Sequence, residues 1–420
     1  MASTLLSYSE ASEQVHLFIE ALAEASGNPP PRRAAEAVSL AYAAGRVLAE
    51  GIRADRDQPP FPRSTRDGFA CRAAEARTNQ LLFLAGHVRA GEMPSAALQA
   101  GEVWEIMTGA PVPEGADAVF MVEHSELASN FVRLLAPRTL EAGENIVPRG
   151  SEARAGDLLV PPGVRITPAQ IAIAAQCGYG QLSVAPRPRV AILSTGDELV
   201  PVESTPGPSQ IRNSNSPMLA ALVTAAGGEP VTLPAIADQD APLDSAVATA
   251  MSLSLAADLL LITGGISAGR FDLVEGALTR AGARFFFGGA AIQPGKPVTF
   301  GQLVRADGRM LPFFALPGNP ISSAVTFHLF AAPLLAALGE DSTPLPRFAL
   351  AQLAGGWRGK PGLTRFLPAC CDFGPASEVR LLPWQGSGDI AAFARSNCFV
   401  MIPPEAQEIA EGSIVQILLT

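Results

Sequence analysis

Two alanine-rich stretches at the start of the chain carry apolar residues at helical spacing. They cover residues 10–26 and 34–50, and the helix-breaking run Gly27-Asn28-Pro29-Pro30-Pro31 separates them. We therefore expect two helices before residue 51. After a loop rich in Pro, Asp and Arg, short β-like runs at 81–88, 102–107 and 117–122 predict a small β-rich insertion that ends near residue 140.

Helical and strand patterns then alternate through the middle of the chain. A helical pattern at 168–177 leads through the Pro-flanked linker 185–189 into a strand at 190–194. This alternation predicts a parallel, doubly wound sheet with helices on both faces, whose ligands lie at the carboxyl ends of the strands. The remaining predicted strands are 231–236, 258–263 and 313–317, and the predicted helices are 216–226, 241–256, 273–282 and 320–338.

After residues 339–344 the pattern returns to short strands, at 347–353, 365–371, 379–384 and 414–419. The sequence therefore predicts a multidomain α/β protein. Its predicted parts are a discontinuous N-terminal domain of residues 1–55 and 140–185, a β-rich inserted domain of residues 56–139, a central doubly wound α/β domain of residues 186–338 and a C-terminal β domain of residues 339–420.

Composition and charge narrow the classes of function. With 420 residues, 48% hydrophobic and 17% charged, the chain can build several cores, and its net charge of −10 argues against a nucleic-acid-binding surface. Apolar stretches are broken by Gly, Pro or charge before ~18 residues, and the first residues lack a basic segment, so we expect no membrane span, no secretory signal and a cytoplasmic protein. The five cysteines show no CxxC spacing and the four histidines are isolated, which favours buried or incidental thiols over a zinc site.

Three predicted strand ends in the α/β domain stop at small, flexible or hydroxyl residues. Glycines there let backbone N–H groups approach an anion closely, and a carboxylate beside them can hold a hydrated cation. One such end is common in turns that only change chain direction, but three together predict one crevice that handles a phosphate or oxyanion. The three ends are Ser194-Thr195-Gly196-Asp197-Glu198, the segment 263–272 with Gly264, Gly265, Ser267, Gly269 and Asp272, and Leu316-Pro317-Gly318-Asn319-Pro320, which Ser322 and Ser323 follow.

Lys296 lies between two prolines, in Pro294-Gly295-Lys296-Pro297, so its position is more restricted than that of an ordinary surface lysine. A fixed lysine beside an anion-binding loop suits an oxyanion ligand, and a solvated hairpin lysine is the alternative. Asp67 and Thr108 lie in stiff loops at 64–70 and 107–111, which taken alone are typical of turns with capping residues.

Nine collinear segments resemble the MoeA-type molybdopterin molybdenumtransferases, a family that includes the E domain of gephyrin. They run through nearly the whole chain, so the resemblance does not depend on one glycine loop. The segments are RSTRDGFA (63–70), TGAPVPEGADAVFMVE (108–123), PRGSEARAGD (148–157), ILSTGDEL (192–199), SNSPMLAALV (214–223), ITGGISAGRFD (262–272), QPGKP (293–297), LPGNPISSAVTF (316–327) and GSGDIAAFARSN (386–397).

The resemblance implies a fold and a reaction. The fold would be an elongated homodimer of four-domain subunits, with a molybdopterin-binding α/β domain and an active site shared with loops of the partner subunit. The reaction would hydrolyse the adenylyl link of adenylylated molybdopterin, insert molybdenum from molybdate and release AMP, with Mg²⁺ assisting. Such an enzyme would contact a molybdopterin adenylyltransferase and acceptor molybdoenzymes transiently. We expect no nucleic-acid or membrane partner.

The resemblance also assigns roles to residues. Asp67, Thr108, Glu198, Asp238 and Asp272 match the family's catalytic positions, and Asp272 and Glu198 would hold Mg²⁺. The positions that would bind molybdopterin, nucleotide or molybdate are Arg149, Ser194, Thr195, Gly196, Asp197, Gly264, Gly265, Ser267, Gly269, Lys296, Pro297, Pro317, Gly318, Asn319, Pro320, Ser322, Arg365 and Ser387.

Several residues depart from the family's usual pattern. The departures are Arg66, Phe69, Arg270 and Arg212-Asn213, the loss of lysines at Gln293 and Gly289, and Gly150-Ser151-Glu152 in place of a Gly-Glu-Asp turn. These departures are consistent with three interpretations: charge compensation in an active enzyme, an altered substrate such as another oxyanion or a modified cofactor, or a non-catalytic molybdopterin-binding scaffold. The alternative enzymatic function is that of a molybdopterin adenylyltransferase. The active insertase is favoured because the chain keeps Asp67, Glu198, Asp238, Asp272 and Lys296 together.

Overall fold

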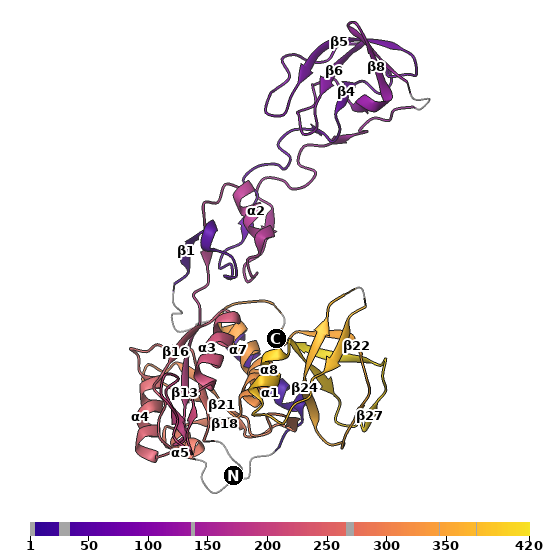
Figure 1. The fold of residues 1–420 in the computed structure, drawn as a ribbon. Helices are drawn as coiled ribbons and strands as arrows, with labels where there is room; N and C mark the ends of the chain where they lie inside the picture. Colours follow the sequence, from indigo (N-terminus) through magenta and orange to yellow (C-terminus); the bar gives the residue numbers. More distant parts are fainter. Residues whose placement is uncertain (1–4, 25–33, 136–138, 266–272, 344, 375) are drawn as a thin grey trace. The chain divides into compact units, whose positions relative to one another are not determined.

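The computed structural model describes residues 5–24, 34–135, 139–265, 273–343, 345–374 and 376–420. The chain divides into two units (Figure 1). The first joins Met1–Ala49, Gly163–Ile166 and Ser183–Thr420, and the second joins Glu50–Pro162 and Thr167–Leu182. Along the chain, the second unit is thus an insertion into the first. The four domain boundaries drawn from the sequence are finer than this division and stay a prediction.

The first predicted helix is confirmed as α1, which spans Tyr8–Glu24. Ala11, Val15 and Phe18 lie on its buried face, at the spacing that places side chains on one side of a helix. These three residues pack into the largest core of the first unit.

The prediction of a second helix at 34–50 is wrong. Glu36–Ser39 form the strand β1, and Leu40–Tyr42 form a single 3₁₀ turn. Beyond this turn, the backbone N–H of Gly45 donates to the carbonyl of Ile166 at 2.8 Å. Pairing with a segment far along the chain therefore overrides the helix propensity of the alanines.

The second unit contains a six-stranded sheet with the order β7-β4-β6-β5-β9-β8. Three of its strands confirm the prediction, namely β5 (Leu81–Val88), β6 (Glu102–Ile106) and β7 (Ala118–Met121). The predicted helix α2 (Pro168–Gln176) is also present, and a capping box at Thr167 fixes its start. The other elements of this part of the chain are β2 (Ile52–Arg53), β3 (Arg63–Ser64), β4 (Gly68–Cys71), a 3₁₀ turn (Val122–His124), β8 (Ser125–Ala128), β9 (Phe131–Leu134), β10 (Ile146–Val147) and β11 (Leu158–Val160), with β12 (Gln181–Val184) after α2.

The central sheet of the first unit has the order β16-β13-β17-β21-β20-β18 (Figure 1). Neighbouring strands from β16 to β21 are parallel, as predicted, but β20 pairs antiparallel with both β21 and β18. The sheet is therefore mixed, because no helix separates β18, β20 and β21 along the chain. The strands are β13 (Arg189–Ser194), β16 (Glu229–Thr232), β17 (Leu259–Thr263), β18 (Arg284–Phe287), β20 (Thr299–Val304) and β21 (Met310–Leu316).

Helices cover both faces of this sheet, as the alternating pattern predicted. Alternate residues of β13 separate the two faces, since Val190 and Ile192 pack with α3 while Ala191 and Leu193 pack with α4 and α5. Strands β16 and β17 flank β13 on opposite sides, so the strand order reverses at β13. In open α/β sheets a crevice forms at such a reversal, beyond the carboxyl ends of the strands. The helices are α3 (Asn215–Ala225), α4 (Asp240–Met251) and α5 (Leu273–Arg280).

The C-terminal part of the first unit is a small β-barrel. Its sheet has the order β19-β24-β25-β22-β28-β26, and an additional pairing of β24 with β26 closes the ring. The four predicted strands are confirmed as β22 (Phe348–Leu353), β24 (Thr364–Asp372), β25 (Glu378–Leu381) and β28 (Ile414–Leu419). The other elements are β19 (Ile292–Gln293), β23 (Trp357–Arg358), α8 (Ile390–Arg395), β26 (Cys398–Ile402) and β27 (Glu408–Ile409).

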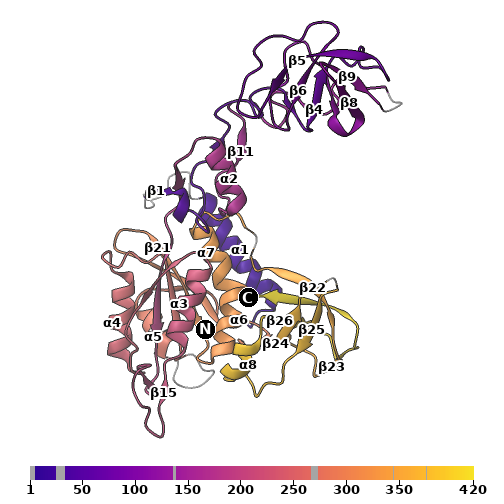
Figure 2. The ribbon, with the colours of Figure 1, turned by 45° about the horizontal axis from the view of Figure 1, so that its top comes forward.

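One long apolar helix connects the central sheet to this barrel. It consists of α6 (Pro320–Thr326), a π-helical turn (Phe327–Ala331) and α7 (Ala332–Leu338), and it lies beside α1 between the two (Figure 2). By length and composition it could cross a membrane, yet 83% of it is buried inside the structure. Burial also lowers the pKa of His328, within the π turn, to about 4, so the imidazole is neutral at pH 7. The apolar composition of this helix is thus explained by its position in the core of the first unit.

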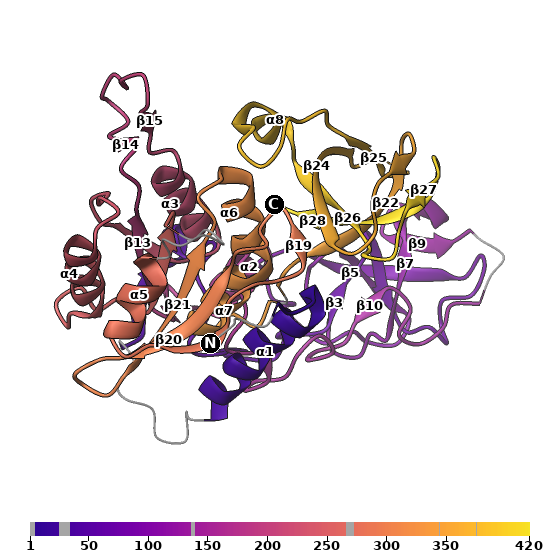
Figure 3. The same cartoon turned by 90° about the horizontal axis from the view of Figure 1, so that it is seen from below.

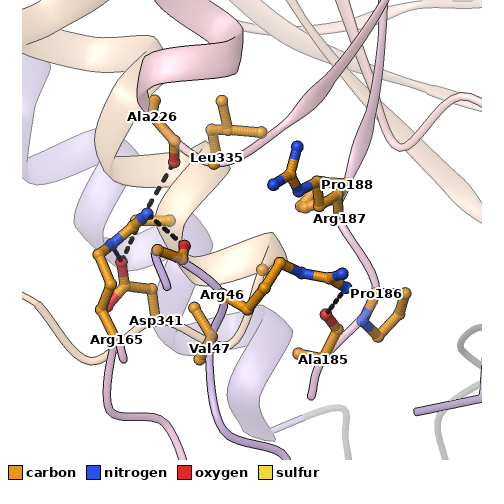
Figure 4. A pocket seen from close by; sticks show the side chains of 14 residues that line it. Arg46, Val47, Arg165, Ala185, Pro186, Arg187, Pro188, Ala226, Leu335 and Asp341 are labelled. Carbon is orange, nitrogen blue, oxygen red and sulfur yellow. Dashed lines mark hydrogen bonds and ion pairs between the residues drawn. The ribbon is translucent and has the colours of Figure 1, made fainter. Parts of the chain in front are cut away.

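Arg165 fastens four distant chain segments of the first unit together (Figure 4). Its Nε and Nη2 donate to Oδ2 of Asp341 at 2.8 and 2.5 Å, and Asp341 is almost fully buried. The guanidinium also donates to the backbone carbonyls of Gly45 at 3.1 Å and Ala226 at 3.2 Å. A buried carboxylate needs such a partner, because its desolvation is otherwise uncompensated.

We expect Arg165→Ala to lower the free energy of unfolding by about 2 kcal/mol, because it leaves the Asp341 carboxylate buried without its cation. Arg358→Ala is the matched control, since Arg358 pairs with Glu408 at 2.8 Å on the open surface. Exposed pairs contribute roughly 0 to 1 kcal/mol. Urea denaturation of both variants measures the difference, and equal losses would show that the Arg165 contacts are not a structural clamp.

Candidate active site

The carboxyl ends of β13, β17 and β21 open on one cleft of about 440 Å³. The three strand ends predicted from the sequence therefore do meet. The described residues that line the cleft are Ser194, Thr195, Glu198 and Leu199 from the end of β13 onwards, Ile211, Arg212, Asn213, Ser214 and Asn215 in the segment that leads into α3, Thr263 and Gly264 at the end of β17, Gly318, Asn319 and Pro320 after β21, and Gly388 and Ile390 of the C-terminal part.

Side-chain hydrogen bonds hold the floor of this cleft. Nδ2 of Asn215 donates to Oγ1 of Thr263 at 2.9 Å and to the Gly318 carbonyl at 2.7 Å, which ties the start of α3 to two strand ends. The hydroxyl of Thr263 in turn donates to the carbonyl of Pro317 at 3.1 Å. These bonds set the spacing between the strand ends before any ligand binds.

Gly264 allows two strand ends to approach more closely than any other residue would. Its φ is +94°, in the left-handed region that favours glycine, and a Cβ at this position would lie 2.1 Å from the carbonyl oxygen of Thr195. At Gly265, with φ +62°, a Cβ would lie 2.7 Å from Oγ1 of Thr195. The glycines predicted to cradle an anion thus pack directly against the end of β13.

Acidic side chains lie beside this junction. Glu198 is exposed in the cleft wall, and its carboxylate covers Gly196, where a Cβ would lie 2.6 Å from Oε2. The backbone N–H of Asp238 donates to Oδ1 of Asp197 at 3.1 Å. Among the described residues, Oδ1 of Asp238 and Oγ1 of Thr195 are buried and have no hydrogen-bond partner. Such atoms usually have a water, ion or ligand as partner.

A second group of predicted residues lies around α6 but does not line the cleft. Gln293 on β19 is in register with Arg365 on β24, and the Arg365 guanidinium lies over the Trp357 ring at 5.6 Å from its centroid. The Lys296 side chain is exposed, while Ser322 is buried. Neither Arg365 nor Lys296 is therefore among the residues that line the cleft with Glu198.

The turn before Lys296 and the loop before α8 both contact α6. A Cβ at Gly295 would lie 2.6 Å from Cγ2 of Thr326, so the turn packs closely on the helix. The carbonyl of Ser387 accepts the backbone N–H of Ile321 at 3.1 Å. Ser387 thus lies at the start of α6, next to the cleft-lining Gly388.

Asp67 and Thr108 form a hydrogen-bonded pair in the second unit. Oδ1 of Asp67 accepts the backbone N–H of Thr108 at 2.6 Å and its hydroxyl at 2.9 Å. These two bonds lower the pKa of Asp67, so the carboxylate stays ionised through the neutral range. Arg149 also lies in this unit, where its Nε donates to Asp57 at 2.8 Å.

Thr108→Val is expected to raise the pKa of Asp67 towards its usual range, because one of the two bonds to the ionised form is lost. Protonation of Asp67 should then begin at a higher pH than in the wild type. Thr108→Ser keeps the hydroxyl and should keep the low pKa. NMR titration of the Asp67 carboxyl carbon measures both, and an unchanged pKa in Thr108→Val would contradict the assigned cause.

The structure brings part of the predicted site together. Seven predicted residues line the cleft: Ser194, Thr195, Glu198, Gly264, Gly318, Asn319 and Pro320. Ser267, Gly269 and Asp272, with the departing Arg270, lie outside the described residues. Sequence reasoning did not single out Leu199, Asn215, Ile211, Gly388 or Ile390, although Leu199, Asn215, Gly388 and Ile390 fall inside the quoted collinear segments.

Three sequence families match consecutive parts of the chain. The MoeA N-terminal region (domain I and II) matches residues 6–178, a probable molybdopterin binding domain matches residues 191–337, and the MoeA C-terminal region (domain IV) matches residues 351–420. The chain is 34% identical over 397 residues to the molybdopterin molybdenumtransferase of Bacillus subtilis (strain 168), an alignment that covers 91% of this chain and 89% of that protein. The chain belongs to the MoeA family of molybdopterin molybdenumtransferases.

Two further MoeA-family proteins are similar to this chain over nearly its whole length. The molybdopterin molybdenumtransferase of Staphylococcus aureus (strain Mu50 / ATCC 700699) is 32% identical over 391 residues, which covers 91% of this chain and 90% of that protein. A crystal structure of the molybdopterin biosynthesis MoeA protein from Pyrococcus horikoshii OT3 matches with a TM-score of 0.78 at 26% identity and covers 99% of this chain and 100% of that one. The resemblance drawn from the sequence, and the transferase class that it implied, are confirmed.

Proposed function

We propose that this MoeA-family enzyme inserts molybdenum from molybdate into adenylylated molybdopterin, hydrolysing the adenylyl link and releasing AMP. The observation that carries the proposal is the single cleft at which three strand ends meet beside the carboxylate of Glu198. Its size is within the range of roughly 300 to 1,000 Å³ that is usual for small-molecule sites. The placement at the reversal of strand order is also where open α/β sheets bind nucleotides.

Two helix starts favour a phosphate in this cleft. Helix α3 begins at Asn215 and the long helix of α6 begins at Pro320, and both residues line the cleft. The first turn of a helix carries a partial positive charge and backbone N–H groups without partners inside the helix. A phosphoanhydride placed between them would have its negative charge stabilised without a basic side chain.

Glu198 is the residue assigned to the hydrolytic step. Its exposed carboxylate can accept a proton from a water molecule and orient that water towards the adenylyl phosphorus. Attack there breaks the bond between that phosphorus and the bridging oxygen, so the pterin leaves with its terminal phosphate and AMP takes the oxygen of the water. Asp238, whose Oδ1 is buried without a partner among the described residues, would be satisfied when the substrate or its cation arrives.

Magnesium belongs to the proposal as the assisting ion. Mg²⁺ commonly takes one or two carboxylates together with phosphate oxygens and water, and Glu198 and Asp238 offer such oxygens. The described ranges contain no cluster of three His, Cys, Asp or Glu side chains that could hold a metal ion. These residues therefore do not surround the ion with protein ligands alone. When bound, the ion would draw negative charge from the phosphates. Asp272 remains a predicted further ligand.

Lys296 and Arg365 are proposed as the molybdate contacts. Both are cationic, and Arg365 is the one whose position the Trp357 ring restricts. Molybdate is a dianion, and charge-assisted hydrogen bonds from such residues are stronger than neutral ones. We further propose that the enzyme acts in the cytoplasm as a homodimer whose partner subunit contributes Asp67 and Thr108.

The proposal is tested with the purified full chain, adenylylated molybdopterin and Mg²⁺, in the presence and absence of molybdate. We expect AMP to appear only when molybdate is supplied. Formation of adenylylated molybdopterin from ATP would instead indicate the adenylyltransferase. Tight molybdopterin binding without AMP release under any condition would indicate a scaffold.

A further inference from the structure

Part of the cleft lining is aliphatic, although its floor is polar. Strands β14 (Leu199–Val200) and β15 (Ile211–Arg212) form a small parallel pair in which Leu199 is in register with Ile211. Both of these aliphatic side chains line the cleft. Ile211 is 57% exposed, so most of its surface is available to a ligand.

Both residues of β15, Ile211 and Arg212, line the cleft, but only Ile211 offers an aliphatic surface. Ile211 shares its side of the strand with Asn213, whose Oδ1 lies 3.5 Å from the Ser194 hydroxyl in the cleft floor. Nε of Arg212 donates to the carbonyl of Ser204, which is not among the cleft-lining residues, at 3.0 Å. Ile211 is therefore the aliphatic side chain that β15 offers to a ligand, beside an arginine that is already hydrogen-bonded to another loop.

A second isoleucine comes from the C-terminal part of the chain. Ile390 is the first residue of α8, lines the same cleft and is 45% exposed. The preceding Asp389 fixes this helix start, since its carboxylate accepts the backbone N–H of Ala392 and of Gln385, each at 3.0 Å. Figure 3 shows β15 and α8 on the same side of the first unit, with α3 and α6 between them.

We infer that Ile211, supported by Leu199, and Ile390 hold the faces of a planar heteroaromatic ring of the substrate. The inference rests on the proposed function, whose substrate carries two such rings, a pterin and an adenine. Aliphatic side chains suit the apolar faces of a ring, while its polar edge needs the hydrogen-bonding groups that form the floor. These residues therefore select for a flat ring, separately from the groups that bind phosphate.

Binding titrations of the full chain with AMP, with 6-hydroxymethylpterin and with molybdate test this inference. Ile211→Ala and Ile390→Ala should each weaken one ring ligand about tenfold, in keeping with the loss of about two buried methylene groups. Molybdate affinity should not change in either variant. The ring ligand that responds, AMP or the pterin, identifies which ring the isoleucines hold.

Two controls separate ring contact from structural damage. Ile211→Leu and Ile390→Leu keep an aliphatic surface and should stay within about threefold of the wild type. Ile414→Ala changes another exposed isoleucine, 64% exposed and outside the cleft lining, and should have no effect.

Unchanged affinity for both rings in both alanine variants would overturn the inference, as would an equal loss of molybdate affinity or a wild type that binds neither ring. A wild type that binds a ring through these isoleucines but releases no AMP would leave the inference standing and refute the proposed insertion reaction.

Discussion

Glu198→Gln is expected to lower kcat for AMP release about 100-fold with little change in KM, because it removes the charge that accepts a proton from the attacking water. The substitution keeps the size of the side chain and its capacity to hydrogen-bond. Glu198 is exposed in the cleft wall, so the fold should not depend on it. Steady-state assays with molybdate present, together with thermal unfolding of the same samples, separate these effects.

Glu203→Gln provides the matched control for Glu198. Glu203 is an exposed acid five residues further along the chain, and it is not among the cleft-lining residues. This variant should keep kcat within about twofold of the wild type, as is usual for surface substitutions away from a site. If Glu198→Gln also kept its kcat within that range, the carboxylate would not be the group that activates water.

Gly264→Ala is expected to lower the free energy of unfolding by about 3 kcal/mol and to abolish AMP release. The added Cβ would lie 2.1 Å from the Thr195 carbonyl oxygen, so the strand ends would have to separate. The left-handed φ of +94° adds strain of about 1 kcal/mol for a residue with a side chain. Since the cleft floor depends on the spacing of these strand ends, activity should be lost even where the chain still folds.

Gly308→Ala isolates the effect of the backbone angle alone. Gly308 has φ +80°, and no atom lies within 4 Å of the position that a Cβ would take. Its substitution should lower the free energy of unfolding by only about 1 kcal/mol and leave activity intact. Equal destabilisation of the two variants in urea denaturation would show that the close approach of Gly264 to Thr195 is unimportant.

The sequence predicted most of what depends on local patterns. Strands β13, β17 and β21 have continuous apolar runs that end at Gly, Ser or Pro, and both the strands and the meeting of their ends were predictable. The true conformation of residues 34–50 could not be predicted, because contacts such as the hydrogen bond from Gly45 to Ile166, more than 100 residues away, decide it. Local composition carries no information on such a partner.

The aliphatic residues that line the cleft could not be predicted from the sequence either. Ile211 and Ile390 are separated by about 180 residues in the chain, and each alone is typical of an ordinary apolar position. Only the fold, which places β15 and α8 on the same side of the first unit (Figure 3), gives them a shared place in the cleft lining.

The structure also narrows the interpretation of the departures from the family pattern. Arg212 lines the cleft, and its Nε donates to the carbonyl of Ser204, so part of its guanidinium is already engaged within the chain. Gln293, in place of a lysine, is in register with Arg365. Fewer basic residues therefore surround the proposed molybdate contacts, and Arg365 and Lys296 become more important to them. Arg270 lies outside the described residues.

The most direct test of the account is the stoichiometry of metal insertion. Wild-type enzyme, adenylylated molybdopterin, Mg²⁺ and molybdate are combined, and the AMP released and the molybdenum bound to the pterin product are measured in the same sample. We predict one molybdenum atom inserted for each AMP released, with neither product formed when molybdate is omitted. AMP release without molybdenum in the pterin product would contradict the account.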